Sequence, residues 1–242
     1  MSIYAVGDIH GNLTLLDGLL DQLVISPGDR LVFLGDYVDR GPDSSGVIER
    51  LIGLRATMGD RCVCLLGNHD EMFLDYWRQT RGRWTEQDGL DARFDEVAEY
   101  GPSAFLTFGG KATLDSYNGD VPKAHIDFLL SLPLRYDQDG YAFVHAGLRP
   151  RGETSRMKML WGAQGFWGEV DPVTGEQIPA DFSELGKTVV VGHAAFDEPQ
   201  IRPGIIAIDT GCGVGGPLTA VQLPEMRFFS RSQFAFNVVD RK

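Results

Sequence analysis

The sequence predicts an α/β fold with α+β character, in which two mixed β-sheets pack together and are sandwiched by helices. Over residues 1–66, apolar runs typical of strands alternate with apolar residues at helical spacing. Residues 134–231 instead contain short β-rich runs separated by Gly, Pro and Asp turns. The chain has 242 residues, 43% hydrophobic and 23% charged, which is close to globular averages and sufficient for a core. Because no repeat or linker interrupts it, we expect a single domain over residues 1–242.

The first part of the chain reads as strand, helix, strand, helix, strand. The predicted strands are Ile3–Val6, Leu31–Leu34 and Cys62–Leu66, and apolar residues at helical spacing predict helices over 13–23 and 47–54. Such units form parallel strands with right-handed crossovers. Functional side chains then gather in loops beyond the carboxyl ends of the strands, and the motifs of this sequence occur there.

The pattern changes at about residues 75–120. Tryptophans, arginines, an acidic stretch and a Gly-rich turn predict a mainly helical insertion, which either caps an active site or forms a solvated surface excursion. A helix is expected at about 122–131, and mixed or antiparallel strands follow it. These predicted strands are Leu134–Tyr136, Tyr141–His145, Thr188–Val191, Gln200–Arg202, Ile205–Ile208, Leu218–Leu223 and Arg227–Arg231.

Charge and hydropathy argue against several classes of protein. With 22 Lys+Arg against 34 Asp+Glu, the net charge is −12, whereas a general nucleic-acid binder needs a surplus of positive charge. The apolar runs are only a handful of residues long, far short of the ~20 that cross a bilayer. The opening residues MSIYAVGDIHG lack the basic and long apolar regions of a secretory signal. We therefore expect a cytoplasmic protein without nucleic-acid or membrane partners, and its oligomeric state stays open.

The cysteines and one histidine are expected to be structural. Cys62, Cys64 and Cys212 are odd in number and lack the spacing of a paired-cysteine metal site. We predict that they are reduced, buried, small hydrophobic residues rather than a disulfide or a metal pair. His125 lies on a helical pattern with no carboxylate partner in sequence, so we expect it to be structural or exposed.

Five short motifs place polar residues beside glycine at the ends of predicted strands. A G-N-H triplet has a chance expectation of about 0.01 at this composition, so motif loops after three consecutive strands are not a coincidence. Glycine permits the tight backbone that is needed where the chain leaves a strand. In chain order the motifs are GDIHG, GDYVDRG, GNHD, HAG and GH, which contain Asp8, His10, Asp36, Asp39, Arg40, Asn68, His69, Asp70, His145 and His193.

A subset of these residues offers oxygen and imidazole ligands. The mixed donor set suits two borderline divalent metals, Mn²⁺ in the first place, with Fe or Zn²⁺ as alternatives. Two cations about 3.5–4 Å apart can polarise one phosphoryl group, and a bridging carboxylate holds them at that distance. Asp36 is the natural bridge. The predicted ligands are Asp8, His10, Asp36, Asn68, His145 and His193.

The five motifs, in this order, resemble those of the phosphoprotein-phosphatase (PPP) family of calcineurin-like metallophosphoesterases. This family contains dinuclear Ser/Thr protein phosphatases and their bacterial and phage relatives. The motifs span residues 7–193, and the segment IIAIDTGCGVGGPLTAV at 205–221 extends the resemblance. The resemblance implies a calcineurin-like fold, with the metals at the edge of two mixed sheets.

The resemblance also implies a role for each motif residue. His69 would protonate the leaving alkoxide, Asp39 would orient His69, and Arg40 would bind two phosphate oxygens. A metal-bridging hydroxide would attack phosphorus in line, without a covalent phosphoenzyme. The implied ligands are Asp8, His10 and Asp36 for the first metal, and Asp36, Asn68, His145 and His193 for the second.

One departure from the family pattern concerns an arginine. Bacterial relatives commonly carry a segment of the type LLWIRE between the last two histidines, and its arginine can reach the phosphate. Here that position is Ala163. Arg149, Arg151 and Arg156 are the candidates to replace it. If none does, the loss of charge-assisted hydrogen bonding is about 1.5–3 kcal/mol.

The predicted function is a metal-dependent phosphatase that hydrolyses phosphoserine and phosphothreonine monoesters, in a phosphoprotein or a small phosphoester. The first alternative is a symmetrical dinucleoside-polyphosphate hydrolase acting on diadenosine tetraphosphate, whose second motif typically lacks the Asp that Asp39 supplies. In that alternative the tryptophans and arginines of 77–84 could stack a base; otherwise they form the end of a surface helix. A second alternative is a non-catalytic module that binds partner proteins, although the complete set of ligands argues against it.

Overall fold

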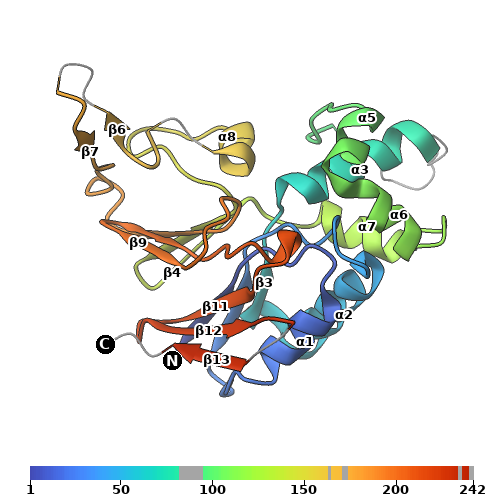
Figure 1. Cartoon of the computed structure of the whole chain (residues 1–242), viewed down its shortest axis with the longest axis horizontal. Helices are drawn as coiled ribbons and strands as arrows, with labels where there is room; N and C mark the ends of the chain where they lie inside the picture. Colours follow the sequence, from blue (N-terminus) through green and yellow to red (C-terminus); the bar gives the residue numbers. More distant parts are fainter. Residues whose placement is uncertain (82–94, 163–164, 171–173, 234–235, 240–242) are drawn as a thin grey trace.

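The computed structural model describes most of the chain, and Figure 1 shows how its elements are arranged. The described residues are 1–81, 95–162, 165–170, 174–233 and 236–239. The helices, with short 3₁₀ and π turns labelled η, are α1 (Leu13–Leu20), α2 (Ser44–Met58), η1 (Gly59–Arg61), α3 (Asn68–Arg81), α5 (Pro102–Phe105), η3 (Leu106–Gly110), α6 (Lys111–Ser116), α7 (Lys123–Leu130), α8 (Arg156–Trp161) and η4 (Cys212–Val214). The strands are β1 (Ile3–Val6), β2 (Arg30–Phe33), β3 (Cys62–Cys64), β4 (Arg135–Gln138), β5 (Tyr141–Val144), β6 (Glu169–Val170), β7 (Gln177–Ile178), β8 (Thr188–Val191), β9 (Gln200–Arg202), β10 (Ile205–Ala207), β11 (Leu218–Leu223), β12 (Arg227–Arg231) and β13 (Phe236–Val239).

Two mixed sheets form the framework. The six-stranded sheet has the order β13-β12-β11-β1-β2-β3, in which β1, β2 and β3 are parallel and β11 to β13 are antiparallel. The five-stranded sheet has the order β4-β5-β8-β10-β9, in which β5, β8 and β10 are parallel and the edge strands β4 and β9 are antiparallel to them. The parallel strands place several carboxyl ends at one edge of each sheet.

The alternation of side chains along the strands explains why the sheets are buried on both faces. In β1, Ile3 and Ala5 point toward the five-stranded sheet, where they meet Phe143 and Val190 in an apolar layer. Tyr4 points to the other face, which α1, α2, α3 and α7 cover. The outer face of the five-stranded sheet packs against α8 and the segments between β5 and β8. This architecture confirms the predicted fold class of two mixed sheets flanked by helices.

Some elements differ from those expected. The helix assigned to the insertion at 75–120 begins earlier, at Asn68, because the GNH motif itself opens α3. In the rest of the described insertion, residues 102–116 are helical, in agreement with the predicted mainly helical character, and residues 95–101 are irregular; residues 82–94 lie outside the described part of the chain. The two-stranded β6–β7 ladder, α8 and β13 were not predicted, because these segments are too short or too mixed in polarity to show a period.

The insertion is attached to α3 through a buried carboxylate. Asp75 accepts the backbone N–H groups of Tyr100 and Gly101 at 2.8 and 2.9 Å. Its other contacts are with Gln79 and Arg78, one turn further along α3. Asp75 therefore fixes the start of the chain segment that continues into α5, η3 and α6.

The cysteines agree with the sequence analysis. Cys62, Cys64 and Cys212 are free and buried, as predicted. Within the part of the chain that the structure describes, none of the helices has both the length and the apolar character that a bilayer span requires.

Replacing Asp75 with Ala is expected to lower the free energy of unfolding by about 2–4 kcal/mol, because two buried backbone N–H groups lose their acceptor. Asp115→Ala is the control, since that carboxylate is exposed and pairs with Lys111 one turn away, a contact worth less than about 0.5 kcal/mol. Urea unfolding followed by circular dichroism measures both changes. Equal unfolding midpoints for the two variants would contradict this role of Asp75.

Candidate active site

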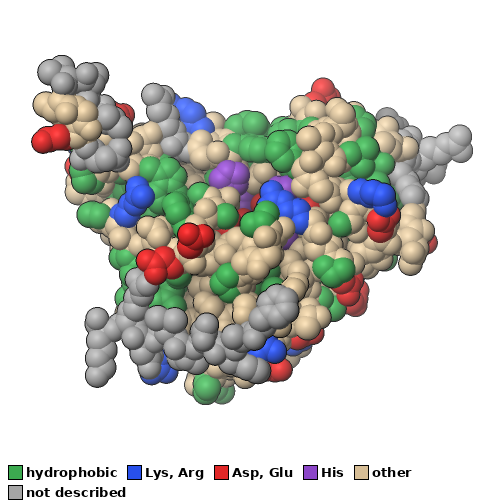
Figure 2. Space-filling model, viewed as in Figure 1, with side chains coloured by type: hydrophobic (Ala, Val, Ile, Leu, Met, Phe, Trp, Pro, Cys, Tyr) green, Lys and Arg blue, Asp and Glu red, His purple; other side chains and the backbone are tan. Residues whose placement is uncertain are grey.

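The predicted site residues come together where the carboxyl ends of the parallel strands of both sheets meet. The loops after β1, β2 and β3 supply one part of the site, and the loops after β5 and β8 supply the other. In the space-filling view, histidine side chains reach the surface near the centre of the face, with basic side chains beside them (Figure 2). Apart from Arg40 and His193, the predicted site residues are buried.

The backbone of these loops is strained. Eight non-glycine residues in the described chain have positive φ, and five of them are predicted site residues: His10, Asp36, Asp39, Arg40 and His193. Each such conformation is unfavourable for a residue with a side chain and persists only where surrounding contacts enforce it. The concentration at one place indicates that the fold maintains this geometry for a function.

Hydrogen bonds to the Asp70 carboxylate enforce part of this strained backbone conformation. Its Oδ2 accepts the N–H groups of Asp36 and Gly67 at 2.9 and 3.0 Å, and its Oδ1 accepts that of Tyr37 at 2.9 Å. The GNHD loop thereby holds the GDYVDRG loop in place. The motif glycines permit this closeness, because a Cβ at Gly67 would collide with the Asp36 carboxylate.

Hydrogen bonds to the backbone set the orientation of two imidazoles. His10 Nδ1 donates to the carbonyl of Val38 at 2.8 Å, and His145 Nδ1 donates to that of Leu34 at 2.9 Å. The Nε2 atom of each ring is therefore left with a lone pair that points into the site. Burial lowers the pKa of His10 to about 3, so this ring is neutral at pH 7 and suited to binding a metal.

These lone pairs converge on oxygen atoms that are also acceptors. His145 Nε2 lies 2.8 Å from Asn68 Oδ1 and 3.4 Å from Asp36 Oδ1. His10 Nε2 lies 3.6 Å from Asp36 Oδ2. Acceptors placed this close repel one another unless a cation lies between them, so the donor set fits a divalent metal.

Asp36 belongs to both groups of converging side chains. One group comprises Asp36, His10 and His69, and the other comprises Asp36, His145 and His193, with all ligand atoms of a group within 4.8 Å of one another. Asn68 Oδ1 lies 3.0 Å from His193 Nδ1 and so adjoins the second group. This arrangement is the one expected of a carboxylate that bridges two cations.

Asp8 is placed differently from the other predicted ligands. Its carboxylate oxygens lie 3.1 and 3.0 Å from the N–H of His193, which donates to them. Burial raises the pKa of Asp8 well above its usual range, and the carboxylates of Asp209 and Asp36 raise it further. Asp209 is buried, and burial raises its own pKa to about 6. The sequence analysis placed it in the segment 205–221 that extends the resemblance but did not count it among the site residues. It follows an apolar strand and precedes a glycine-containing turn, the same signal that identified the other motifs.

His69, Asp39 and Arg40 form a second arrangement beside the predicted ligands. His69 Nδ1 donates to Asp39 Oδ2 at 2.7 Å, and an Arg40 terminal nitrogen lies 3.0 Å from His69 Nε2, to which it donates when that nitrogen carries no proton. The other terminal nitrogen of Arg40 lies 3.1 Å from His10 Nε2. Burial lowers the pKa of His69, but Asp36 and Asp39 outweigh it, so the pKa of this imidazole is raised. The two carboxylates thus favour the protonated form of the ring, which a proton donor requires.

The insertion contacts this second arrangement. The carbonyl of Gly109 accepts the N–H of Arg40 at 3.2 Å. The ring of Phe108, 44% exposed, lies edge-on to those of His69 and Trp161, each at 6.1 Å. Of the two interpretations of the insertion, the structure favours the one in which it covers part of the site.

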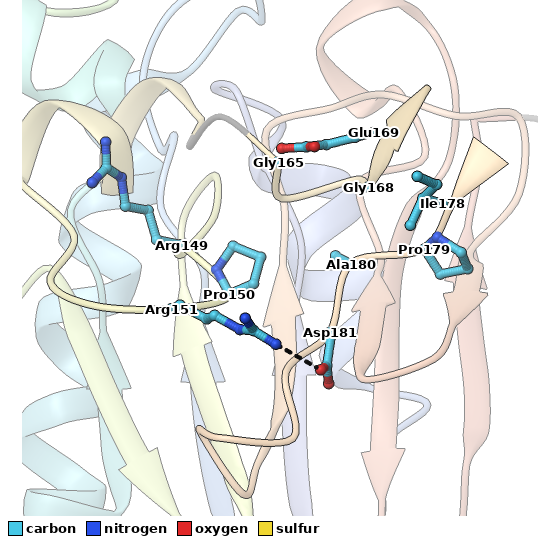
Figure 3. Close-up of a pocket in the computed structure, with 10 residues that line it drawn as sticks. All are labelled: Arg149, Pro150, Arg151, Gly165, Gly168, Glu169, Ile178, Pro179, Ala180 and Asp181. Atoms are coloured by element: carbon cyan, nitrogen blue, oxygen red, sulfur yellow. Dashed lines mark hydrogen bonds and ion pairs between the residues drawn. The ribbon is translucent and has the colours of Figure 1, made fainter. Parts of the chain in front are cut away.

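Two of the three candidates to replace the missing arginine pair with carboxylates outside the predicted ligand set. Arg151 pairs with Asp181 at 3.4 Å, and Arg156 donates to the buried Glu71 at 2.6 Å. Arg149 and Arg151 line a pocket of about 600 Å³ beside the β6–β7 ladder, where Figure 3 shows Arg151 pointing toward Asp181. None of these contacts is with a predicted metal ligand. Ala163 lies outside the described residues.

Two other residues from the sequence analysis prove to be structural. His125 is buried between Tyr117 and Glu49, which lie 2.8 and 2.9 Å from its ring nitrogens. Trp77 is buried in the core, which leaves little of it to stack on a base. Arg83 and Trp84 lie outside the described residues.

Comparison with known proteins agrees with this site. A family model described as calcineurin-like phosphoesterase matches residues 1–205. The chain belongs to this family. It is therefore a hydrolase of the metallophosphoesterase class, and the calcineurin-like fold implied by the sequence motifs is confirmed.

The curated relatives are similar over nearly their whole length. The symmetrical bis(5'-nucleosyl)-tetraphosphatase of Aromatoleum aromaticum is 27% identical over 290 aligned positions, which cover 95% of this chain and 96% of that protein. The asymmetrical enzyme of Oceanobacillus iheyensis is also 27% identical and covers 95% and 92% of the two chains. The crystal structure of a candidate diadenosine tetraphosphatase has the same fold, with a TM-score of 0.63 at 24% identity over 96% of this chain and 93% of that one.

Replacing Asp70 with Ala is expected to lower the free energy of unfolding by about 3–5 kcal/mol, because three buried N–H groups lose their acceptor. Asp70→Asn retains one carbonyl oxygen and should lose less. Thermal and urea unfolding of the metal-free protein measure both. If Asp70→Ala unfolds at the wild-type urea concentration, Asp70 does not hold the two loops together.

Proposed function

We propose that the protein hydrolyses dinucleoside tetraphosphates such as diadenosine tetraphosphate, and that it uses two divalent cations to do so. The observation that carries this proposal is the pair of histidine–carboxylate groups that share Asp36. Relatives named as bis(5'-nucleosyl)-tetraphosphatases, similar to 95% of the chain, support this substrate class. They support the alternative from the sequence analysis better than its main prediction of a phosphoprotein substrate.

The cations would be held by the six residues that the sequence analysis selected. His10 and His145 present lone pairs toward Asp36, while Asn68 and His193 complete the second group. Asp8 is the remaining carboxylate on the side of His10. Cations bound there would polarise the scissile phosphate and lower the pKa of a water molecule. Mn²⁺ is the proposed metal.

The neighbouring residues would act on the substrate directly. Arg40 has a planar fork at the mouth of the site and would bind two phosphate oxygens, which neutralises charge in the transition state. His69 would donate a proton to the leaving oxygen. The Asp39 carboxylate fixes the orientation of that ring and stabilises its protonated form.

A phosphoserine or phosphothreonine monoester is the second candidate substrate. The specific observation in its favour is the 2.7 Å contact between Asp39 and His69. An alkoxide is a poor leaving group and needs a proton donor, whereas a nucleotide leaves as a phosphate anion that is stable in water. A well-held proton donor is therefore more valuable to a monoesterase than to a tetraphosphatase.

Metal binding is the first test. Calorimetric titration of the wild-type protein with Mn²⁺ is expected to give two sites per chain. Asp36→Asn should weaken binding by more than about tenfold, because the loss of even an outer-shell partner typically costs roughly 10–100-fold. Asp17→Asn is a matched control, since Asp17 is exposed and pairs with Arg50. Equal affinities for the two variants would rule out Asp36 as a shared ligand.

The substrate test compares diadenosine tetraphosphate with a phosphothreonine peptide at the same Mn²⁺ concentration. We expect a higher kcat/KM for the dinucleotide, with two ADP molecules as products of symmetrical cleavage. His69→Asn should lower kcat by about 10²-fold on the peptide and by less on the dinucleotide, because the nucleotide leaving group needs less protonation. A higher kcat/KM for the peptide would support the second candidate instead, and ATP plus AMP would indicate asymmetrical cleavage.

A further inference from the structure

A threonine in the insertion makes two hydrogen bonds to Asp39. Thr113 lies in α6, 74 residues after Asp39 in the sequence, and it is fully buried. Its hydroxyl donates to Asp39 Oδ1 at 2.7 Å, and it accepts the backbone N–H of Asp39 at 2.8 Å. One hydroxyl therefore holds both the side chain and the backbone of a residue with positive φ.

A neighbouring serine completes this contact. Ser44, at the start of α2 and also fully buried, lies 3.0 Å from the Thr113 hydroxyl and 3.1 Å from the Asp39 nitrogen. Because the Thr113 hydrogen is directed to the Asp39 carboxylate, Ser44 must be the donor in its bond with Thr113. The hydroxyl of Thr113 thus has a defined direction, with its hydrogen pointing at Oδ1.

The two oxygens of Asp39 have separate partners. Oδ1 accepts from Thr113, and Oδ2 accepts from His69 Nδ1 at 2.7 Å. A carboxylate fixed at one oxygen cannot rotate away from the imidazole bound at the other. The orientation of the His69 ring therefore depends on a side chain that does not contact the ring itself.

We infer that Thr113 is a positioning residue for the reaction: through Asp39 it holds His69 in the orientation needed to donate a proton to the leaving group. The inference rests on the proposed role of His69. It also assigns a function to the insertion, because α6 supplies the group that completes the arrangement of Asp39 and His69.

The test uses two phosphate monoesters that differ in their need for a proton. The p-nitrophenolate ion leaves readily without one, whereas phenolate is a poorer leaving group. With Mn²⁺-loaded protein, Thr113→Val should lower kcat on phenyl phosphate by about tenfold or more, as expected for loss of a supporting hydrogen bond, with a smaller loss on p-nitrophenyl phosphate and little change in KM. Thr113→Ser, which keeps the hydroxyl, should restore kcat. Thr57→Val removes an exposed hydroxyl on α2 as a control.

A double-mutant comparison separates positioning from general damage. In an Asp39→Asn background, Thr113→Val should lower kcat little further, since both act through the same ring. Three results would each overturn the inference. In the first, Thr113→Val lowers kcat equally on both monoesters; in the second, it lowers kcat in the Asp39→Asn background as much as in the wild type. In the third, Thr113→Ser fails to restore kcat. Thr113→Ala, which cannot crowd the core, replaces Thr113→Val if the latter does not fold.

A second readout does not depend on activity. In metal-free protein, the His69 Nδ1 proton should give a downfield proton NMR signal, assigned by its loss in His69→Asn. Thr113→Val should shift or broaden this signal, and Thr113→Ser should preserve it. An unchanged signal in Thr113→Val would overturn the inference. If His69→Asn leaves kcat on phenyl phosphate unchanged, the proposed role of His69 fails, and the NMR signal alone decides whether Thr113 holds the ring.

Discussion

The structure depends on the close approach of several buried acceptors that would repel one another in isolation. Asp8, Asp36, Asp70 and Asp209 are all buried near one point, and neutral imidazoles direct further lone pairs toward it. Their burial is tolerable only because backbone N–H groups, an arginine and, when bound, cations offset it. The strained loops, the motif glycines and the meeting of two sheet edges are all means of assembling these groups. Bringing these groups together therefore lowers the stability of the fold, although the proposed chemistry requires it.

The loops are held in place by contacts from outside them. Asp70 fixes the loop that carries Asp36, and Gly109 and Thr113 fix the backbone of Arg40 and Asp39. In each case a short polar contact maintains a backbone conformation that the residue itself disfavours. The geometry of the site thus depends on α3 and the insertion as much as on the sheets.

The sequence predicts the framework and the candidate ligands because both obey local rules. Strand periodicity placed β8, β9, β11 and β12 within their observed bounds, and glycine beside a polar residue at a strand end identified every predicted site residue. Thr113 left no such signal, since a threonine in a helix has no local feature that distinguishes a structural hydroxyl from an exposed one. Asp209 also follows a strand and precedes a glycine-containing turn, but no histidine or asparagine lies beside it in the sequence to mark it as a site residue. The substrate could not be derived from the residues alone, because the same ligands can serve a monoester and an anhydride.

The order of the strands has a consequence for synthesis of the protein. In the six-stranded sheet β1 lies between β2, the next strand made, and β11, which begins at Leu218. One edge of β1 stays unpaired while most of the chain leaves the ribosome, and an unpaired apolar edge is prone to association with other chains. Asp8 likewise meets the N–H of His193 only after 185 further residues have been made. The nascent chain therefore has the first three motifs of the site long before the site can form, and molecular chaperones have a long interval in which to bind it.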